Sequence, residues 1–179
     1  MSRPTRTVNA LVNARVTHVV GIPDNTSGPL FPEILRHPTL RLVTTTREGE
    51  AVALAAGLWL GGARPLVVIQ NTGLLESGDA LRGTAVRMAA AVPLLITGRG
   101  YAKMREAGVT PADERTIESL TRPDVDSTAL LTEPTLDAWG IPFTVCGDGD
   151  DPSVAIRELV SSSERQGRPV AMILTRALD

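Results

Sequence analysis

Six short apolar runs recur along the chain, and each is followed by a turn and then by a stretch whose sequence suits a helix. Three of the runs are almost continuously apolar, which is typical of parallel strands that helices cover on both faces. This alternation predicts an α/β fold, a doubly wound and mainly parallel six-stranded sheet with helices on both faces. The runs lie at residues 17–22, 40–44, 66–70, 92–97, 141–146 and 169–174.

The segments between these runs predict six helices. The last of them has a clear start signal, because Asp150 and Asp151 precede Pro152 at the first helical position. The stretch 98–131 is rich in charge, proline and threonine and is longer than a usual connection, so we expect an irregular loop there, with a short helix near 115–120. The expected helices span 4–14, 28–36, 48–61, 77–91, 132–139 and 152–166.

Composition supports one packed domain over residues 1–179, because 42% of the residues are hydrophobic and 21% are charged. A net charge of −2 and an aromatic share of 3% argue against a nucleic-acid partner. The longest apolar stretch, 51–60, is about half of the ~20 residues that a membrane span needs, so we expect no membrane association. The single cysteine, Cys146, cannot form an internal disulfide, and with no secretory leader visible we expect a cytoplasmic protein.

Candidate chemistry gathers at the turns that follow the first four strands, where open α/β sheets bind their ligands. The second of these turns contains Glu48, which opens a helix whose middle, 51–60, is too uniformly apolar for a surface helix. Glu48 would then be a carboxylate at the mouth of an apolar cleft. The alternative is an ordinary first-turn acid, favoured there by the helix dipole. The four turns lie at 21–25, 44–48, 70–73 and 97–100.

Three segments in register, 47–51, 55–57 and 62–73, resemble the pyrimidine-binding (PYR) domain of thiamine diphosphate enzymes. In that family a glutamate followed by alanine three residues later opens a helix, a Gly/Pro turn follows, and the next strand ends in a small polar turn. The sequence is most similar to the α subunit of sulfopyruvate decarboxylase and to the PYR part of phosphonopyruvate decarboxylase. The resemblance is close over roughly 5–100, and it is also supported by 21–25, 70–74 and 92–100.

The resemblance implies a role for Glu48 in activating thiamine diphosphate. The glutamate would face N1′ of the aminopyrimidine, so that the 4′-amino group becomes an imine able to take the C2 proton. A 2-oxo acid substrate would then be attacked and would lose CO₂, with the cofactor as electron sink. Acetolactate synthase-like carboligation uses the same opening steps and remains an open alternative.

The other turns contain weaker candidates for cofactor and substrate contacts. By the resemblance, Gln70, Asn71, Thr72 and Gly73 would lie near the pyrimidine, and Asn25 would approach the substrate. Each of these residues is equally well explained as a turn residue that caps the next helix.

Basic residues follow the fourth strand at Arg99, Lys103 and Arg105. They would either meet an anionic substrate tail or belong to a solvated loop. Sequence alone leaves both interpretations open.

The metal-binding half of such an enzyme is missing from the pattern. In the family a PP domain holds the diphosphate through Mg²⁺ with a Gly-Asp-Gly sequence and a later asparagine. Gly147-Asp148-Gly149 is present, but asparagine occurs only at 9, 13, 25 and 71, so we interpret it as a strand-to-helix turn and expect no metal site.

The resemblance therefore implies a PP-domain β subunit as partner, holding the Mg²⁺, in a hetero-oligomer with at least two copies of each subunit. The apolar helix at 51–60 would form part of that interface. A non-catalytic PYR-fold scaffolding or regulatory subunit is a second hypothesis. A single-chain nucleotide-binding protein is a third, without a phosphate loop to support it.

Overall fold

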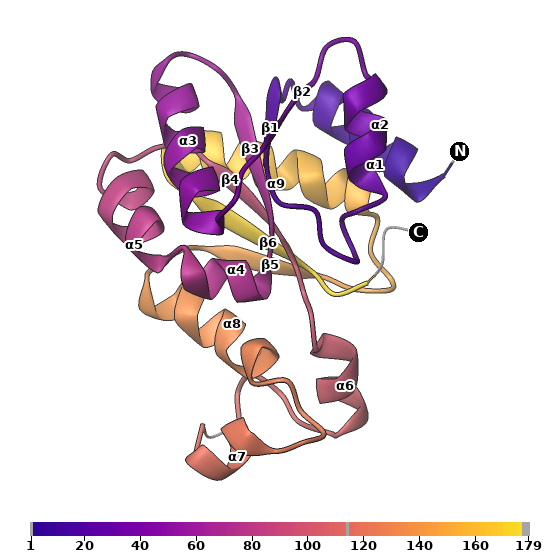
Figure 1. The fold of residues 1–179 in the computed structure, drawn as a ribbon, viewed down its shortest axis with the longest axis vertical. Coiled ribbons are helices and arrows are strands. Elements are labelled where there is room, and N and C mark those ends of the chain that lie inside the picture. Colours follow the sequence, from indigo (N-terminus) through magenta and orange to yellow (C-terminus); the bar gives the residue numbers. More distant parts are fainter. Residues whose placement is uncertain (1, 114, 177–179) are drawn as a thin grey trace.

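Six strands form one sheet in the order β2-β1-β3-β4-β6-β5 in a computed structural model that describes residues 2–113 and 115–176 (Figure 1). All the pairings between these strands are parallel, which confirms the predicted doubly wound α/β sheet. The predicted domain 1–179 includes positions 1, 114 and 177–179, which lie outside the described residues. The strands are β1 His18–Gly21, β2 Arg41–Thr44, β3 Pro65–Gln70, β4 Pro93–Thr97, β5 Phe143–Cys146 and β6 Val170–Leu174.

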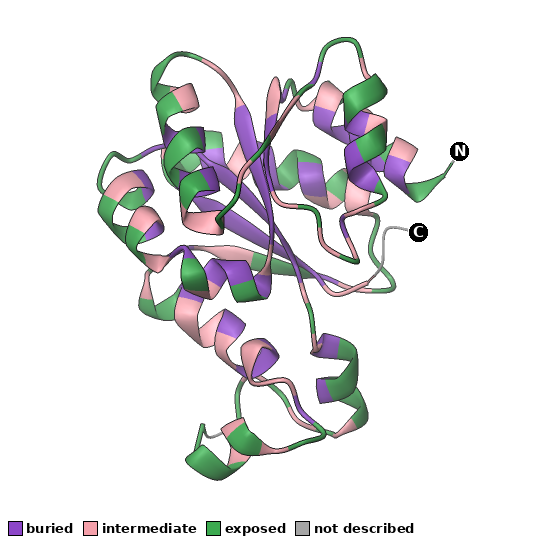
Figure 2. Cartoon of the chain, viewed as in Figure 1, coloured by how far each residue is buried: buried purple, intermediate pink, exposed green. Residues whose placement is uncertain are grey.

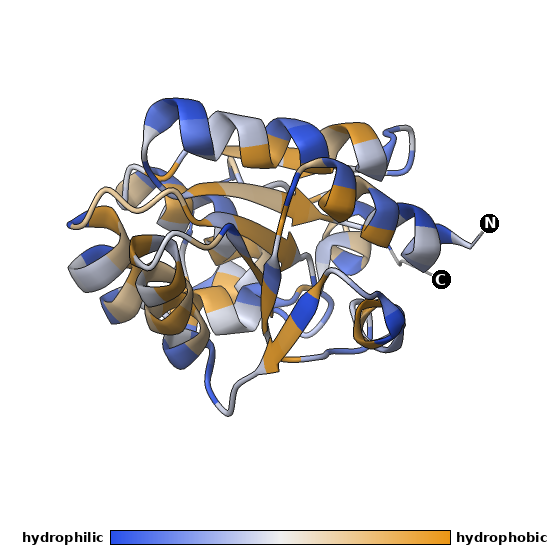
Figure 3. Ribbon diagram, turned by 90° about the horizontal axis from the view of Figure 1, so that it is seen from above, coloured by the Kyte–Doolittle hydropathy of each residue, from blue (hydrophilic) through white to orange (hydrophobic). Residues whose placement is uncertain are grey.

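Helices cover both faces of this sheet, and a separate apolar cluster fills the space on each side (Figures 2 and 3). Along β3, Leu66 and Val68 belong to the cluster under α1, α2 and α9, whereas Val67 and Ile69 belong to the cluster under α3, η1 and α8. Burial on both faces explains the continuous apolar runs. The helices are α1 Arg3–Asn13, α2 Leu30–Arg36, α3 Glu48–Leu60, α4 Asn71–Glu76, α5 Gly78–Ala80, the π-helix η1 Leu81–Val86, α6 Tyr101–Glu106, α7 Ile117–Thr121, α8 Ser127–Ala138 and α9 Pro152–Gln166.

No helix in the described part of the chain is long and apolar enough to cross a membrane.

The predicted boundaries of α9 are confirmed at both ends. Asp151 caps it by accepting a hydrogen bond from the Ser153 N–H at 2.9 Å, and Gly167 ends it with φ 58°.

The helix predicted at 77–91 is wrong at both ends, and η1 ends at Val86. Helical structure begins directly at the end of β3, with α4 at Asn71, and continues through α5 to the π-helix η1. A turn is predicted at residues 71–73 because asparagine, threonine and glycine favour turns. Their tertiary contacts, described below, hold them in a helix.

The predicted irregular loop at 98–131 contains more helix than expected. The short helix expected near 115–120 is present as α7, but α6 was not predicted, and α8 begins at Ser127, five residues before the predicted start at 132. Tyr101 in α6 donates a hydrogen bond from its hydroxyl to Glu133 Oε1 in α8 at 3.1 Å. Burial raises the pKa of both groups, so this link lies in a partly desolvated contact between α6 and α8.

Gly21, the last residue of β1, passes unusually close to the backbone of β3. A Cβ at this position would lie 1.9 Å from the carbonyl oxygen of Val68, which the sheet holds in place. We therefore expect Gly21→Ala to lower the free energy of unfolding by about 3 kcal/mol or more in urea denaturation. Gly57→Ala is the control, because a Cβ there meets nothing within 4 Å and alanine favours a helix by about 1 kcal/mol. Equal stability of the two variants would contradict the close approach.

Candidate active site

Glu48 is the first residue of α3 and its half-buried side chain lies against the backbone of Gly73 in α4. A Cβ on Gly73 would fall 2.2 Å from Glu48 Cγ and 2.5 Å from both Cδ and Oε1. The missing side chain of Gly73 therefore makes the room that the Glu48 carboxyl occupies. Two of the predicted site residues, from turns after different strands, are in direct contact.

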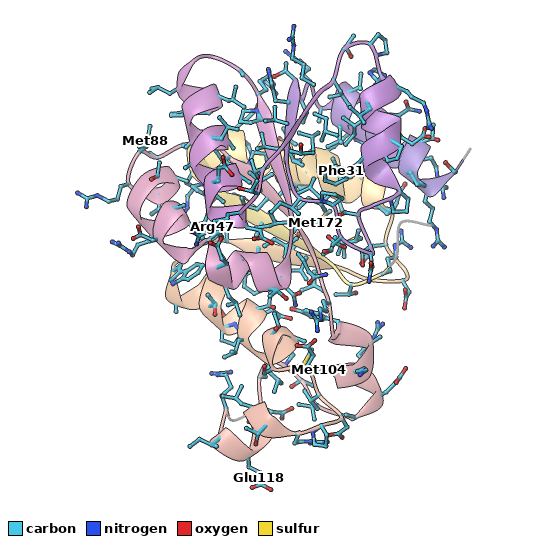
Figure 4. The ribbon with its side chains drawn as sticks, viewed as in Figure 1. Phe31, Arg47, Met88, Met104, Glu118 and Met172 are labelled. Atoms are coloured by element: carbon cyan, nitrogen blue, oxygen red, sulfur yellow. The ribbon has the colours of Figure 1, made fainter. Side chains whose placement is uncertain are left out.

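The start of α3 is fixed to α4 by Glu76. One of its carboxylate oxygens accepts hydrogen bonds from Arg47 Nε at 2.9 Å and Nη2 at 2.5 Å, and the other accepts from the Gly49 N–H at 2.7 Å. The Gly49 N–H and the Arg47 guanidinium hold the pKa of Glu76 below its usual range. Figure 4 shows Arg47 at this junction of the two helices. Both chain neighbours of Glu48 are thus held in place.

Asn71 is fully buried and links three separate parts of the chain. Its Nδ2 donates to the carbonyl oxygen of Arg99 at 2.9 Å and to Thr132 Oγ1 at 3.1 Å, and its Oδ1 accepts from the Arg99 N–H at 3.1 Å. Both amide hydrogens are used inside the protein. Asn71 therefore joins the start of α4 to the segment after β4 and to α8.

Gln70 and Thr72 lie within three residues of Gly73 in the chain. Gln70 is half-buried at the end of β3, and Thr72 is exposed in the first turn of α4. The Thr72 hydroxyl donates to Gln70 Oε1 at 3.2 Å. An amide and a hydroxyl that bond to each other therefore precede Gly73, which contacts the Glu48 carboxyl.

Asn25 is exposed in the turn after β1, and the preceding residue, Asp24, holds this turn in place. The Asp24 carboxylate accepts from the N–H groups of Thr26 and Ser27, from the Ser27 hydroxyl at 2.8 Å and from the Thr97 hydroxyl at 2.9 Å. Sequence reasoning missed this role of Asp24. The signal was present in the spacing of Asp24 and Ser27, which is typical of an Asx-type turn.

The sequence Gly147-Asp148-Gly149 lies in the turn between β5 and α9. The Gly147 N–H donates to Asp150 Oδ2 at 2.7 Å, and Asp148 forms an ion pair with Arg105 at 3.5 Å. Within residues 2–113 and 115–176, no group of three or more His, Cys, Asp or Glu side chains is placed to hold a metal ion.

Comparison with known families matches residues 5–114 to the thiamine pyrophosphate enzyme, N-terminal TPP binding domain. Among curated proteins, phosphonopyruvate decarboxylase of Streptomyces viridochromogenes is 38% identical over 95 residues, which cover 52% of this chain and 23% of that protein. Sulfopyruvate decarboxylase of Methanosarcina acetivorans is 36% identical over 75 residues, covering 42% of this chain and 18% of that protein. This chain therefore matches less than a quarter of the length of these relatives.

Among solved structures, a thiamine diphosphate-dependent 4-hydroxybenzoylformate decarboxylase of Rhodococcus jostii RHA1 has a similar fold. The TM-score is 0.61 at 17% sequence identity, and the match covers 98% of this chain and 30% of that chain. The likeness extends the shared fold beyond residue 114, to β5, α9 and β6.

Proposed function

We propose that this chain, which belongs to the thiamine pyrophosphate enzyme N-terminal TPP binding domain family, is the PYR subunit of a two-subunit 2-oxo acid decarboxylase. The main support for the proposal is the contact of the half-buried Glu48 carboxyl with Gly73 at the carboxyl edge of the sheet. Ligands of open α/β sheets bind at this edge.

The residues around this contact fit an aminopyrimidine ring. The Glu48 carboxyl is a partner for a ring nitrogen, and the amide of Gln70 and the hydroxyl of Thr72 offer hydrogen bonds to an exocyclic amino group. Thiamine diphosphate, when bound, supplies the electron sink for the carbanion that is left when CO₂ departs.

In this proposal each residue of the site has a distinct role. Glu48 shares a proton with the ring nitrogen and so controls the protonation of the amino group on the ring. Glu76 of α4 holds the start of α3, and Asn71 anchors α4 to the segment after β4, so that Glu48 stays at the ring. Asn25, exposed after β1, faces the 2-oxo acid substrate.

We assign the diphosphate and its Mg²⁺ to a separate PP-domain subunit, because Asp148 of the Gly-Asp-Gly sequence, in the β5–α9 turn, is paired with Arg105 of α6.

An exposed apolar surface on α3 and η1 supports such a partner. Leu54 and Leu60 of α3 are 39% and 69% exposed, and Val86 and Met88 are 39% and 37% exposed on and just after the neighbouring η1. Large apolar side chains exposed on neighbouring elements support a protein interface here. We propose a hetero-oligomer with at least two copies of each subunit.

The substrate class follows from the relatives, which are named for phosphonopyruvate and sulfopyruvate. Both compounds are 2-oxo acids that carry a second strong-acid group. We propose a substrate of this class for the complex that contains this chain.

The test is to purify this chain through an affinity tag from its own cells, and to compare the recovered complex with the chain alone. With thiamine diphosphate, Mg²⁺ and either substrate, we expect CO₂ release from the complex and none from the isolated chain. Turnover by the isolated chain at the rate of the complex would overturn the two-subunit proposal.

A matched pair of variants tests the interface. Leu60→Asp, on the proposed partner surface, should reduce recovery of the partner about tenfold or more. Leu35→Asp on α2 is the control, because Leu35 is 70% exposed on the opposite face of the sheet. Equal recovery with both variants would exclude the α3 surface as the interface.

A further inference from the structure

Arg99 is hydrogen-bonded to Asn71, which belongs to the same helix as Gly73, the residue that contacts Glu48. It follows β4 at the carboxyl edge of the sheet, and its backbone N–H and C=O both bond to the side chain of Asn71. Asn71 stands two residues before Gly73 on the same short helix. The backbone of Arg99 is therefore anchored beside the proposed cofactor site.

The two glycines that flank Arg99 allow close packing around this anchor. A Cβ on Gly98 would lie 2.9 Å from the Tyr101 ring and 3.3 Å from the carbonyl oxygen of Leu174. Gly100 has φ 85°, and a Cβ there would lie 2.4 Å from the Cβ of Asp126. The backbone carrying Arg99 therefore has little room to move.

The Arg99 guanidinium, by contrast, projects into solvent. Its side chain is 60% exposed, and its closest ion-pair contact joins Nε to Asp126 Oδ2 at 3.0 Å. Neither of its two terminal nitrogens donates a hydrogen bond to another of the described residues. Other arginines near this edge use a terminal nitrogen, since Arg47 Nη2 bonds to Glu76 and Arg105 Nη1 pairs with Asp148.

We propose that Arg99 binds the second anionic group of the substrate, a tetrahedral phosphonate or sulfonate, through its two terminal nitrogens. This inference rests on the proposed decarboxylase function. The backbone of Arg99 is anchored, and the free edge formed by its two terminal nitrogens matches two oxygens of such a group, which a single ammonium does not do. Arg99 is therefore a specificity-determining residue, which selects substrates by the charge of their tail.

The experiment measures CO₂ release by the purified complex with three probes, phosphonopyruvate, sulfopyruvate and pyruvate, which lacks the second anion. For Arg99→Gln we expect kcat/KM to fall about 10- to 100-fold with the two anionic substrates, mainly through KM, and to stay within about twofold with pyruvate. Arg99→Lys should recover part of the loss. The control is Lys103→Gln, because Lys103 is exposed one turn further along in α6 and should leave all three probes within about twofold.

The outcomes separate this inference from the proposed function. An equal loss with all three probes, or no loss with the anionic ones, overturns the role of Arg99 and leaves the decarboxylase function standing. A loss confined to one of the two anionic probes identifies that tail as the one bound. A native complex that decarboxylates none of the three overturns the proposed function, and this inference with it.

Discussion

Replacing Glu48 by glutamine should lower the decarboxylation rate of the assembled complex by about 10²- to 10⁴-fold, the range typical of a lost general acid–base group. Glutamine has nearly the same shape as glutamate and preserves the packing against Gly73, but it cannot share a proton with a ring nitrogen. The loss should appear in kcat, because the substrate does not contact this side chain. The measurement is steady-state CO₂ release at saturating thiamine diphosphate.

Glu50→Gln is the matched control for this experiment. Glu50 lies two residues further along in the same first turn, is exposed, and accepts hydrogen bonds from the N–H and hydroxyl of Thr46. We expect its activity to stay within about threefold of the native complex. A fall of only a few fold for Glu48→Gln would instead support the hypothesis of a non-catalytic scaffolding subunit.

Gly73→Ala should lower activity about 100-fold with little change in stability. The new Cβ would overlap Glu48 Cγ, Cδ and Oε1, which belong to a side chain that can rotate away. Glu48 would then leave its position at the ring, and a displacement of about 1 Å is enough for a loss of this size. Because alanine favours helices over glycine, the free energy of unfolding should stay within about 1 kcal/mol of the native value.

The control for this variant is Gly149→Ala, where a Cβ meets nothing within 4 Å. Circular dichroism and urea denaturation report the fold, and CO₂ release reports activity. A Gly73→Ala complex with native activity would show that the position of Glu48 against α4 does not matter for the reaction.

The strands could be predicted from sequence because burial on both faces produces continuous apolar runs, as in β3, β4 and β6. The start of α9 could also be predicted from sequence, since its capping signals are local. The start of α4 was not, because it depends on Asn71. The partners of Asn71 are 28 and 61 residues away in sequence, so local preferences for a turn at 71–73 gave the wrong answer.

The candidate site was predictable only in part for a similar reason. The position of Glu48 after β2 and before an apolar helix pointed to an unusual carboxylate, while its role came from the family resemblance. Its contact with Gly73 depends on how α3 packs on α4, which no local pattern encodes. The anchoring of Arg99 by Asn71 is likewise a tertiary feature, so the sequence left Arg99 open between a substrate contact and a solvated loop.

The most direct test of the proposed role of Glu48 is the rate at which the C2 proton of bound thiamine diphosphate exchanges with deuterium. Rapid quenching and NMR can follow this exchange in the assembled complex without any substrate. If Glu48 activates the cofactor, exchange should be at least about 100-fold slower with Glu48→Gln than with the native chain or with Glu50→Gln. Equal exchange rates in all three complexes would show that Glu48 does not activate the cofactor.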